Sequence, residues 1–199
     1  MSKTILFTTV FCLLIFGGCS KVKTTKTADS SFILYIIKAG EQYSNNNTFM
    51  LIENIAEMKF SAKFDSSAIY TSINPTNQYD VNKLYGFSDN NTHHHINSAR
   101  IGWRWLNNRL ELLGYIYNDT VRSFELIKTV SINTTINCSI KINGNKYVFT
   151  VDGTSIEMPR TATTASGYQL YPYFGGDEVA PHDIKIEIRL AWIVKFKLH

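Results

Sequence analysis

Alternation of apolar and polar residues with a period of two constrains this chain more than any other feature. Residues 98–105 (SARIGWRW) alternate without a break, and their apolar face consists of Ala99, Ile101, Trp103 and Trp105. Successive side chains of a β-strand point to opposite faces, so this stretch predicts a strand with one buried face. After Asn107-Asn108, residues 110–117 (LELLGYIY) resume the alternation. Two such runs joined by a short turn predict a β-hairpin.

Similar runs recur along the rest of the chain. Strands are predicted at 32–37, 49–52, 121–130, 136–142, 147–151, 168–174 and 184–190, and residues 191–198 extend or follow the last of them. Asn143-Gly144 and Asp152-Gly153 predict tight turns, because Asn and Gly accept positive φ. Residues 53–64 fit helical and strand spacing, and we favour a strand. Residues 66–92 are rich in Asn, Ser and Thr and predict long loops around one or two short strands. The pattern indicates an all-β sandwich or barrel.

The N-terminus has the features of an export signal. Lys3 precedes an apolar run at 5–16, which is shorter than the roughly 20 residues that span a bilayer. The run ends in Gly17-Gly18-Cys19, which resembles the lipobox of bacterial lipoproteins, although Phe16 stands where Leu is usual. The resemblance implies a signal peptide at 1–18 and acyl chains such as palmitate on Cys19, which together give firm anchoring. The alternative is a plain secretory signal in which Cys19 is incidental.

Residues 19–31 are polar and lysine-rich, so we expect a flexible tether, with a charged first strand as the alternative. Residues 32–199 then suit one β-sandwich domain. Cys138 is the only cysteine left for that domain, and we expect a small buried hydrophobe without a disulfide partner. Ser20 after Cys19 favours the outer membrane, since Asp there resembles a retention signal. The net charge of +4 includes no basic block, which argues against a nucleic-acid partner.

Three consecutive histidines precede the clearest strand. On an extended chain His93 and His95 would share a face, and such a pair can bind a metal ion. No HExxH, CxxC or calcium-loop motif supports that assignment. We therefore expect no cofactor and keep a metal at His93 and His95 as an alternative. The simpler interpretation is a polar loop in which one histidine contacts a ligand or an aromatic ring.

The polar face of the predicted hairpin is a candidate glycan site, formed by Arg100, Arg104, Glu111, Tyr115 and Tyr117. Aromatic rings stack on sugar faces, and Arg holds carboxylate or hydroxyl groups in fork geometry. The alternative is a solvated outer face with cross-strand ion pairs.

The connection at 171–183 (YPYFGGDEVAPHD) is a second candidate, with Tyr173, Asp177 and His182 as its ligand-binding residues. Two prolines and a Gly-Gly pair give it a defined backbone. It would contact a ligand or, alternatively, pack a crossover between two sheets.

The segments HHHINSARIGWRW, LELLGYIY and YPYFGGDEVAPHDIKIEI are similar to small lipoproteins of gut-type bacteria that carry concanavalin-like jelly-roll domains. The resemblance covers residues 84–190. It implies an antiparallel two-sheet jelly roll and a connection with glycans, but no catalytic residue can be transferred from it.

These observations favour a lipid-anchored envelope protein with a non-catalytic glycan-binding or surface-assembly domain, whose partners are the membrane and a polysaccharide. The competing hypothesis is a polysaccharide lyase or glycoside hydrolase acting through the same polar hairpin face, which would be the concave face of a jelly-roll sheet. Such a lyase needs a His or Tyr base and an Arg that neutralises the uronate. The third hypothesis is a structural envelope protein without a small ligand.

Overall fold

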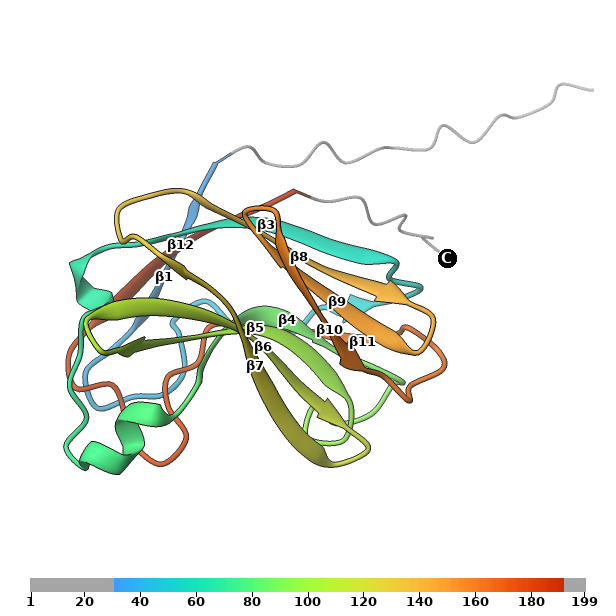
Figure 1. Ribbon diagram of the computed structural model, residues 1–199, viewed down its shortest axis with the longest axis horizontal. Coiled ribbons are helices and arrows are strands. Elements are labelled where there is room, and N and C mark those ends of the chain that lie inside the picture. The colour runs from blue at the N-terminus through green and yellow to red at the C-terminus, as the bar shows by residue number, and fades with distance from the viewer. Residues whose placement is uncertain (1–30, 192–199) are drawn as a thin grey trace, which may run out of the picture.

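Two antiparallel sheets packed face to face make up the computed structural model, which describes residues 31–191 (Figure 1). The first sheet has the order β1-β12-β3-β8-β9-β10 and the second has the order β2-β11-β4-β5-β6-β7. The strands of the first sheet are β1 (Ile33–Ile37), β12 (Ile184–Leu190), β3 (Glu57–Phe64), β8 (Ile136–Asn143), β9 (Lys146–Val151) and β10 (Thr154–Pro159). Those of the second are β2 (Leu51–Ile52), β11 (Gly167–Leu170), β4 (Asn82–Ser88), β5 (Ser98–Leu106), β6 (Arg109–Asn118) and β7 (Val121–Val130). The predicted all-β antiparallel sandwich is confirmed.

The hairpin predicted from the strongest alternation is β5–β6. Arg104 lies opposite Glu111 in its register, and Arg100 lies opposite Tyr115. Asn107 and Asn108 adopt φ values of 52° and 57°, as a two-residue turn between right-twisted strands requires. The alternating apolar residues of both strands therefore face the first sheet, and the charged residues face outward. Leu113 is an exception, because it packs with Val81 and Tyr115 in a separate cluster.

Weakly patterned segments depart from the predicted elements. Residues 57–64 form the favoured strand, β3, whereas the strand expected at 49–52 has only two residues, Leu51–Ile52. Thr154–Pro159 form an unpredicted strand, β10, held by its pairing with β9. The loop-rich region contains the 3₁₀ helices η1 (Ser66–Ala68) and η2 (Pro75–Tyr79). The strand expected at 168–174 ends at Leu170, and the chain beyond it makes only isolated bridges.

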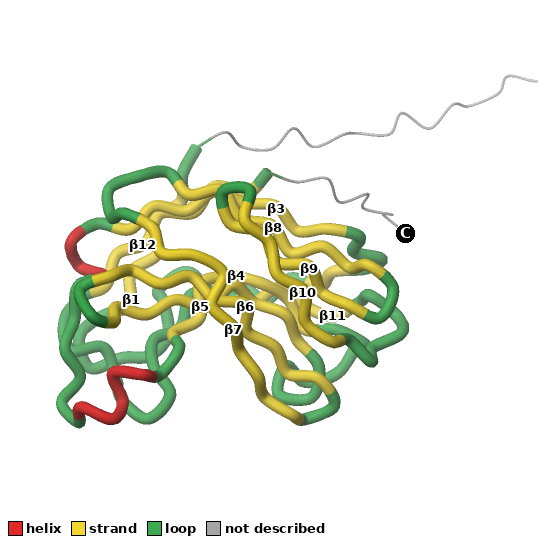
Figure 2. Tube along the Cα trace, in the orientation of Figure 1, coloured by secondary structure: helices red, strands yellow, loops and turns green. Residues whose placement is uncertain are grey.

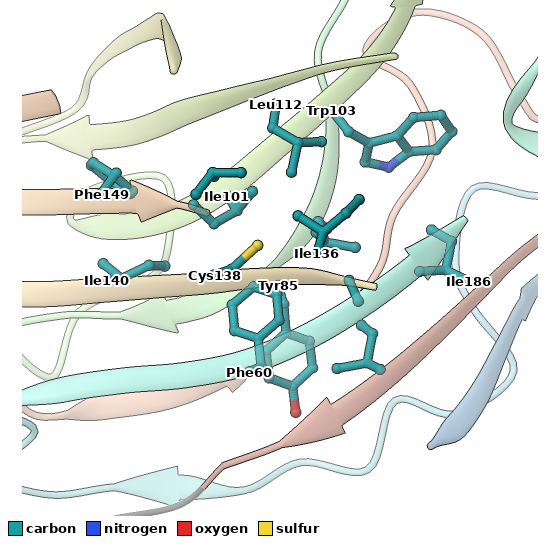
Figure 3. Close-up of a cluster of buried hydrophobic side chains, with 14 of the residues drawn as sticks. Phe60, Tyr85, Ile101, Trp103, Leu112, Ile136, Cys138, Ile140, Phe149 and Ile186 are labelled. Carbon is teal, nitrogen blue, oxygen red and sulfur yellow. The ribbon is translucent and has the colours of Figure 1, made fainter. Parts of the chain in front are cut away.

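The core lies between the two sheets and is rich in aromatic rings (Figure 3). Phe60, Trp103 and Phe149 are almost completely buried there. Cys138 is 4% exposed, and burial raises the pKa of its thiol. This cysteine is thus the small buried hydrophobe that the sequence predicts.

One buried ion pair joins the two sheets. Asp89, directly after β4, accepts hydrogen bonds from the Tyr147 hydroxyl and from Arg160 Nε, both at 2.7 Å. Tyr147 belongs to β9, and Arg160 directly follows β10. Removing one partner of such a pair leaves a buried charge uncompensated, so loss of either Asp89 or Arg160 would strongly destabilise the sandwich.

The predicted signal peptide, the lipidated Cys19, nearly all of the tether and residues 192–198 lie outside the described residues. Within residues 31–191, no helix has the length and apolar character needed to cross a membrane.

Candidate functional site

The outer face of the second sheet, turned away from the first sheet, carries the charged and aromatic side chains. Figure 2 shows this sheet curving, with η2 near one end and the β6–β7 turn near the other. The pairing registers of β4 to β7 place these side chains on the same face. We call this surface the outer face, and the side chains considered on it are Lys83, Arg100, Arg104, Glu111, Tyr115, Tyr117, Phe124 and Tyr168.

Arg100 is the most unusual residue of the outer face. It is only 7% exposed, and its Nε–H has no hydrogen-bond partner. No ion pair among the described residues involves it. Burial lowers the pKa of Arg100 to about 10, although four tyrosines, Tyr115, Tyr168, Tyr117 and Tyr173, counteract this effect. A buried guanidinium without an anion is costly, so the outer face has a built-in preference for an anionic group.

Lys83 adds a second cation, which is partly buried. Its Nζ donates a 2.7 Å hydrogen bond to the Gly175 carbonyl and lies 5.0 Å from the centre of the Tyr115 ring and 5.5 Å from that of Tyr173. Burial, and to a smaller extent repulsion from Arg100, lowers the pKa of Lys83 to about 8. The two cations therefore share one face with no carboxylate paired to either of them in the described part of the chain.

His94 and Tyr168 form a hydrogen-bonded pair beside these cations. The Tyr168 hydroxyl accepts from the His94 backbone N–H at 3.1 Å and lies 2.8 Å from His94 Nδ1. Since the oxygen already accepts one hydrogen bond, we assign its proton to the bond with Nδ1. Burial, followed by the charge of Arg100, lowers the pKa of His94 to about 3. The imidazole is therefore neutral at ordinary pH.

The histidine triplet does not lie on an extended chain, as the alternation argument assumed. The His93 carbonyl accepts from Ile96 N–H at 2.8 Å and from Asn97 N–H at 3.3 Å, so the backbone turns. His93 and His95 are exposed, and His94 is the partly buried member that faces Tyr168. The expectation that His93 and His95 share a face away from His94 was wrong, because turn hydrogen bonds replace the strand pattern.

Arg104 and Glu111 pair with each other across the hairpin. Arg104 Nε lies 2.7 Å from Glu111 Oε2, and a second guanidinium nitrogen donates to the Tyr79 carbonyl. Arg104 and Glu111 thus form a cross-strand ion pair, which was the alternative to a glycan site. Their charges are satisfied inside the protein, unlike that of Arg100.

The aromatic candidates form a continuous ring surface. Tyr115 and Phe124 are stacked with an interplanar angle of 5°, and Tyr117 packs against Tyr115 on one side and His95 on the other. Phe124 is 43% exposed. Burial raises the pKa of Tyr115 to about 12, so its phenol is protonated. These rings could stack on the apolar face of a sugar.

Only part of the connection at 171–183 reaches the outer face. Tyr173 pairs with Lys83 through reciprocal backbone hydrogen bonds. Asp177 instead donates its backbone N–H to Asp80 Oδ2, and the His182 ring bonds the Ser67 carbonyl of η1. Asp177 and His182 thus fix loops, as the packing alternative predicts.

The sequence-based candidates missed Lys83, His94 and Tyr168. Lys83 lies in the region predicted to form long loops around one or two short strands, and the predicted strand that contains Tyr168 offers no local sign of a site. Only the tertiary structure reveals Lys83 and Tyr168 as site residues. The residues that pair between β4 and β11 are 80 residues or more apart in the sequence, and their pairing brings Lys83 and Tyr168 near Arg100.

Two surface hollows lie elsewhere. One of about 670 Å³ is lined by residues that include Trp105, Lys128 and Asp152, and another of about 260 Å³ is lined by η2 and Leu106. Neither contains an unpaired buried charge, so we place the candidate site on the outer face.

Comparisons with known proteins identify the fold. No protein-family model matches the chain, and no curated protein sequence matches it. Alginate lyase AlyC3 superposes with a TM-score of 0.58 at 10% identity, over 84% of this chain and 76% of that one. The structure of AlyC3 in complex with dimannuronate gives 0.57 at 9% identity, over the same shares of the two chains. The marine PL7 alginate lyase AlyA1 from Zobellia galactanivorans gives 0.50 at 9%, over 87% and 84%. The predicted jelly-roll architecture is confirmed.

Proposed function

We propose that the outer face binds an acidic polysaccharide that contains uronate units and cleaves it by β-elimination. The observation that carries this proposal is Arg100, a buried cation without an anionic partner. A polysaccharide lyase, which was the competing hypothesis from the sequence, thereby replaces the non-catalytic glycan-binding module as the leading hypothesis. The fold shared with the alginate lyases AlyC3 and AlyA1 supports this order.

A uronate carboxylate complements the outer face in charge and shape. Arg100 offers a planar fork suited to two carboxylate oxygens, and Lys83 adds a point charge. Pairing with a carboxylate offsets the burial of both cations, so glycan binding relieves a cost already present in the free protein. The exposed ring of Phe124 and the ring of Tyr117, which both contact Tyr115, then provide stacking surfaces for adjacent sugars.

The elimination needs a group that removes the proton at C5 of the uronate and one that protonates the leaving O4. Arg100, paired with the carboxylate, makes the C5 proton more acidic. The Tyr168 proton moves to His94 Nδ1, and the phenolate oxygen then takes the C5 proton. The C4–O4 bond breaks as the C4–C5 double bond forms, O4 takes that proton from Tyr168, and His94 returns its own. Burial is the main cause of the low pKa of His94, and the field of Arg100 is the second. The bound carboxylate offsets that second cause and so raises the basicity of the ring.

One observation favours the non-catalytic glycan-binding module as a second candidate. The Tyr168 hydroxyl makes both of its hydrogen bonds to His94, so it is already satisfied within the protein. In that case Tyr168 only orients the histidine, and the outer face holds the polysaccharide without breaking it.

Incubation with a panel of polyuronates separates these candidates. The double bond of an elimination product absorbs in the ultraviolet, so product formation is followed directly. We expect Tyr168→Phe to lower turnover by about 10²- to 10⁴-fold with binding retained, and Arg100→Met to abolish binding. Tyr79→Phe, an exposed tyrosine on η2, is the matched control. Binding without product supports the non-catalytic module, and failure to bind any anionic glycan refutes both.

We also propose that acyl chains on Cys19 hold the protein at the outer membrane. The lipobox-like Gly17-Gly18-Cys19 supports this proposal. Cys19→Ala should move the protein from the membrane fraction to the soluble fraction, and mass spectrometry should show loss of the acyl mass. Acylation-free Cys19 in the native protein would overturn it.

A further inference from the structure

Three imidazoles converge at the rim of the outer face. One ring nitrogen from each of His93, His94 and His95 lies within 4.8 Å of the others. The ring centres are 4.2, 4.5 and 5.0 Å apart. No other trio of His, Cys, Asp or Glu within residues 31–191 meets the same criterion.

The backbone of this turn is fixed on both sides. Thr92 donates its backbone N–H and its hydroxyl to the Asp89 carbonyl, and the Ser98 hydroxyl donates to the His94 carbonyl at 2.7 Å. The His93 carbonyl accepts from two N–H groups. These hydrogen bonds fix the backbone of the turn, so less conformational entropy is lost when the three side chains gather on one side.

The hydrogen bonds at Nδ1 of His94 and His93 leave Nε2 as the ring nitrogen that would bind a metal ion. Nδ1 of His94 bonds the Tyr168 hydroxyl, and Nδ1 of His93 accepts from the His95 backbone N–H at 3.3 Å. Because Nδ1 accepts a hydrogen bond in both rings, Nε2 carries the proton in the ion-free protein, and a metal ion at Nε2 requires the proton to shift to Nδ1. For His93 this shift also gives up the 3.3 Å contact with the His95 backbone N–H. A metal on His94 Nε2 would leave a proton on Nδ1, which then donates to the Tyr168 oxygen. Metal-bound histidines are normally oriented by such an outer contact.

We propose that His93, His94 and His95 bind one divalent transition-metal ion, with Zn²⁺ as the representative ion. Three histidines with a fourth position open form a donor set that zinc uses. Bond lengths of about 2.0–2.1 Å require the nitrogens to move closer together, and the exposed rings of His93 and His95 have the freedom to rotate.

Two cations lie near the three imidazoles. Arg100 and Lys83 act on His94 and His95 electrostatically, and their charges oppose a bare dication. An anionic fourth ligand would offset that repulsion. The ion site and the cleavage step use His94 in different tautomers, and the test of the ion site contains no glycan, so it succeeds or fails separately from cleavage.

The test is a titration of the full-length protein, prepared without a histidine tag, with Co²⁺ followed by visible absorbance and then with Zn²⁺ as competitor. One equivalent should bind, and His93→Ala and His95→Ala should each weaken binding by at least about tenfold. His182→Ala, which removes an exposed histidine bonded to Ser67, is the matched control and should bind as the native protein does. Absence of binding, or binding that survives His95→Ala, would overturn the proposal.

Discussion

Replacing Arg100 with methionine should stabilise the free protein while it removes glycan binding. Burial lowers the pKa of Arg100 from 12.5 to about 10, and each unit corresponds to about 1.4 kcal/mol, so the buried charge costs about 3 kcal/mol. Methionine cannot fill all the volume of the guanidinium, and a small cavity takes back part of the gain. We expect a net gain of about 1–3 kcal/mol in the free energy of unfolding.

Urea unfolding and thermal melting measure this gain. For a chain of this size, each kcal/mol shifts the Tm by about 2–4 °C. Arg104→Met is the matched control, because Arg104 lies on the same strand and face but is paired with Glu111 at 2.7 Å. Its removal leaves Glu111 without its ion-pair partner and should cost about 1–3 kcal/mol.

A higher free energy of unfolding in Arg100→Met together with a lower one in Arg104→Met would show that the outer face keeps one cation unpaired for a ligand. The reasoning is refuted if Arg100→Met lowers the free energy of unfolding as much as Arg104→Met does. Arg100 would then be stabilising the fold rather than awaiting an anion.

Three further outcomes are expected. Asp89→Asn should cost about 3–5 kcal/mol of unfolding free energy in urea titrations, because Arg160 would lose its buried counter-ion; a loss below about 1 kcal/mol contradicts the role of this pair. Affinity for a polyuronate should fall as the pH rises through about 8, since Lys83 loses its proton there while the carboxylate stays ionised; in Lys83→Met this step should be absent from calorimetric titrations. Cys138 should react with alkylating reagents only after unfolding, since burial raises the pKa of its thiol; rapid labelling of the Cys138 peptide in native protein, detected by mass spectrometry, would contradict the packing of the core.

The strongly alternating segments could be predicted because their information is local. In residues 98–117, each side chain goes to the core or to the outer face by its position alone, and Asn107-Asn108 closes the turn. The weak segments could not be predicted in the same way. Residues 154–159 alternate poorly and become a strand only because β9 offers its edge.

The amino-acid sequence by itself determined that this chain is an all-β protein and that Arg100, Tyr115 and Tyr117 share a surface, because each residue's position in the period-two alternation sets the face on which it lies. Only the tertiary structure decided which charges are satisfied. Glu111 lies within reach of Arg104 and leaves Arg100 alone, and β11 brings Tyr168 to His94 from 74 residues away. Residues as far apart in the chain as His94 and Tyr168 come into contact through strand pairing, and a local sequence pattern does not predict such a contact.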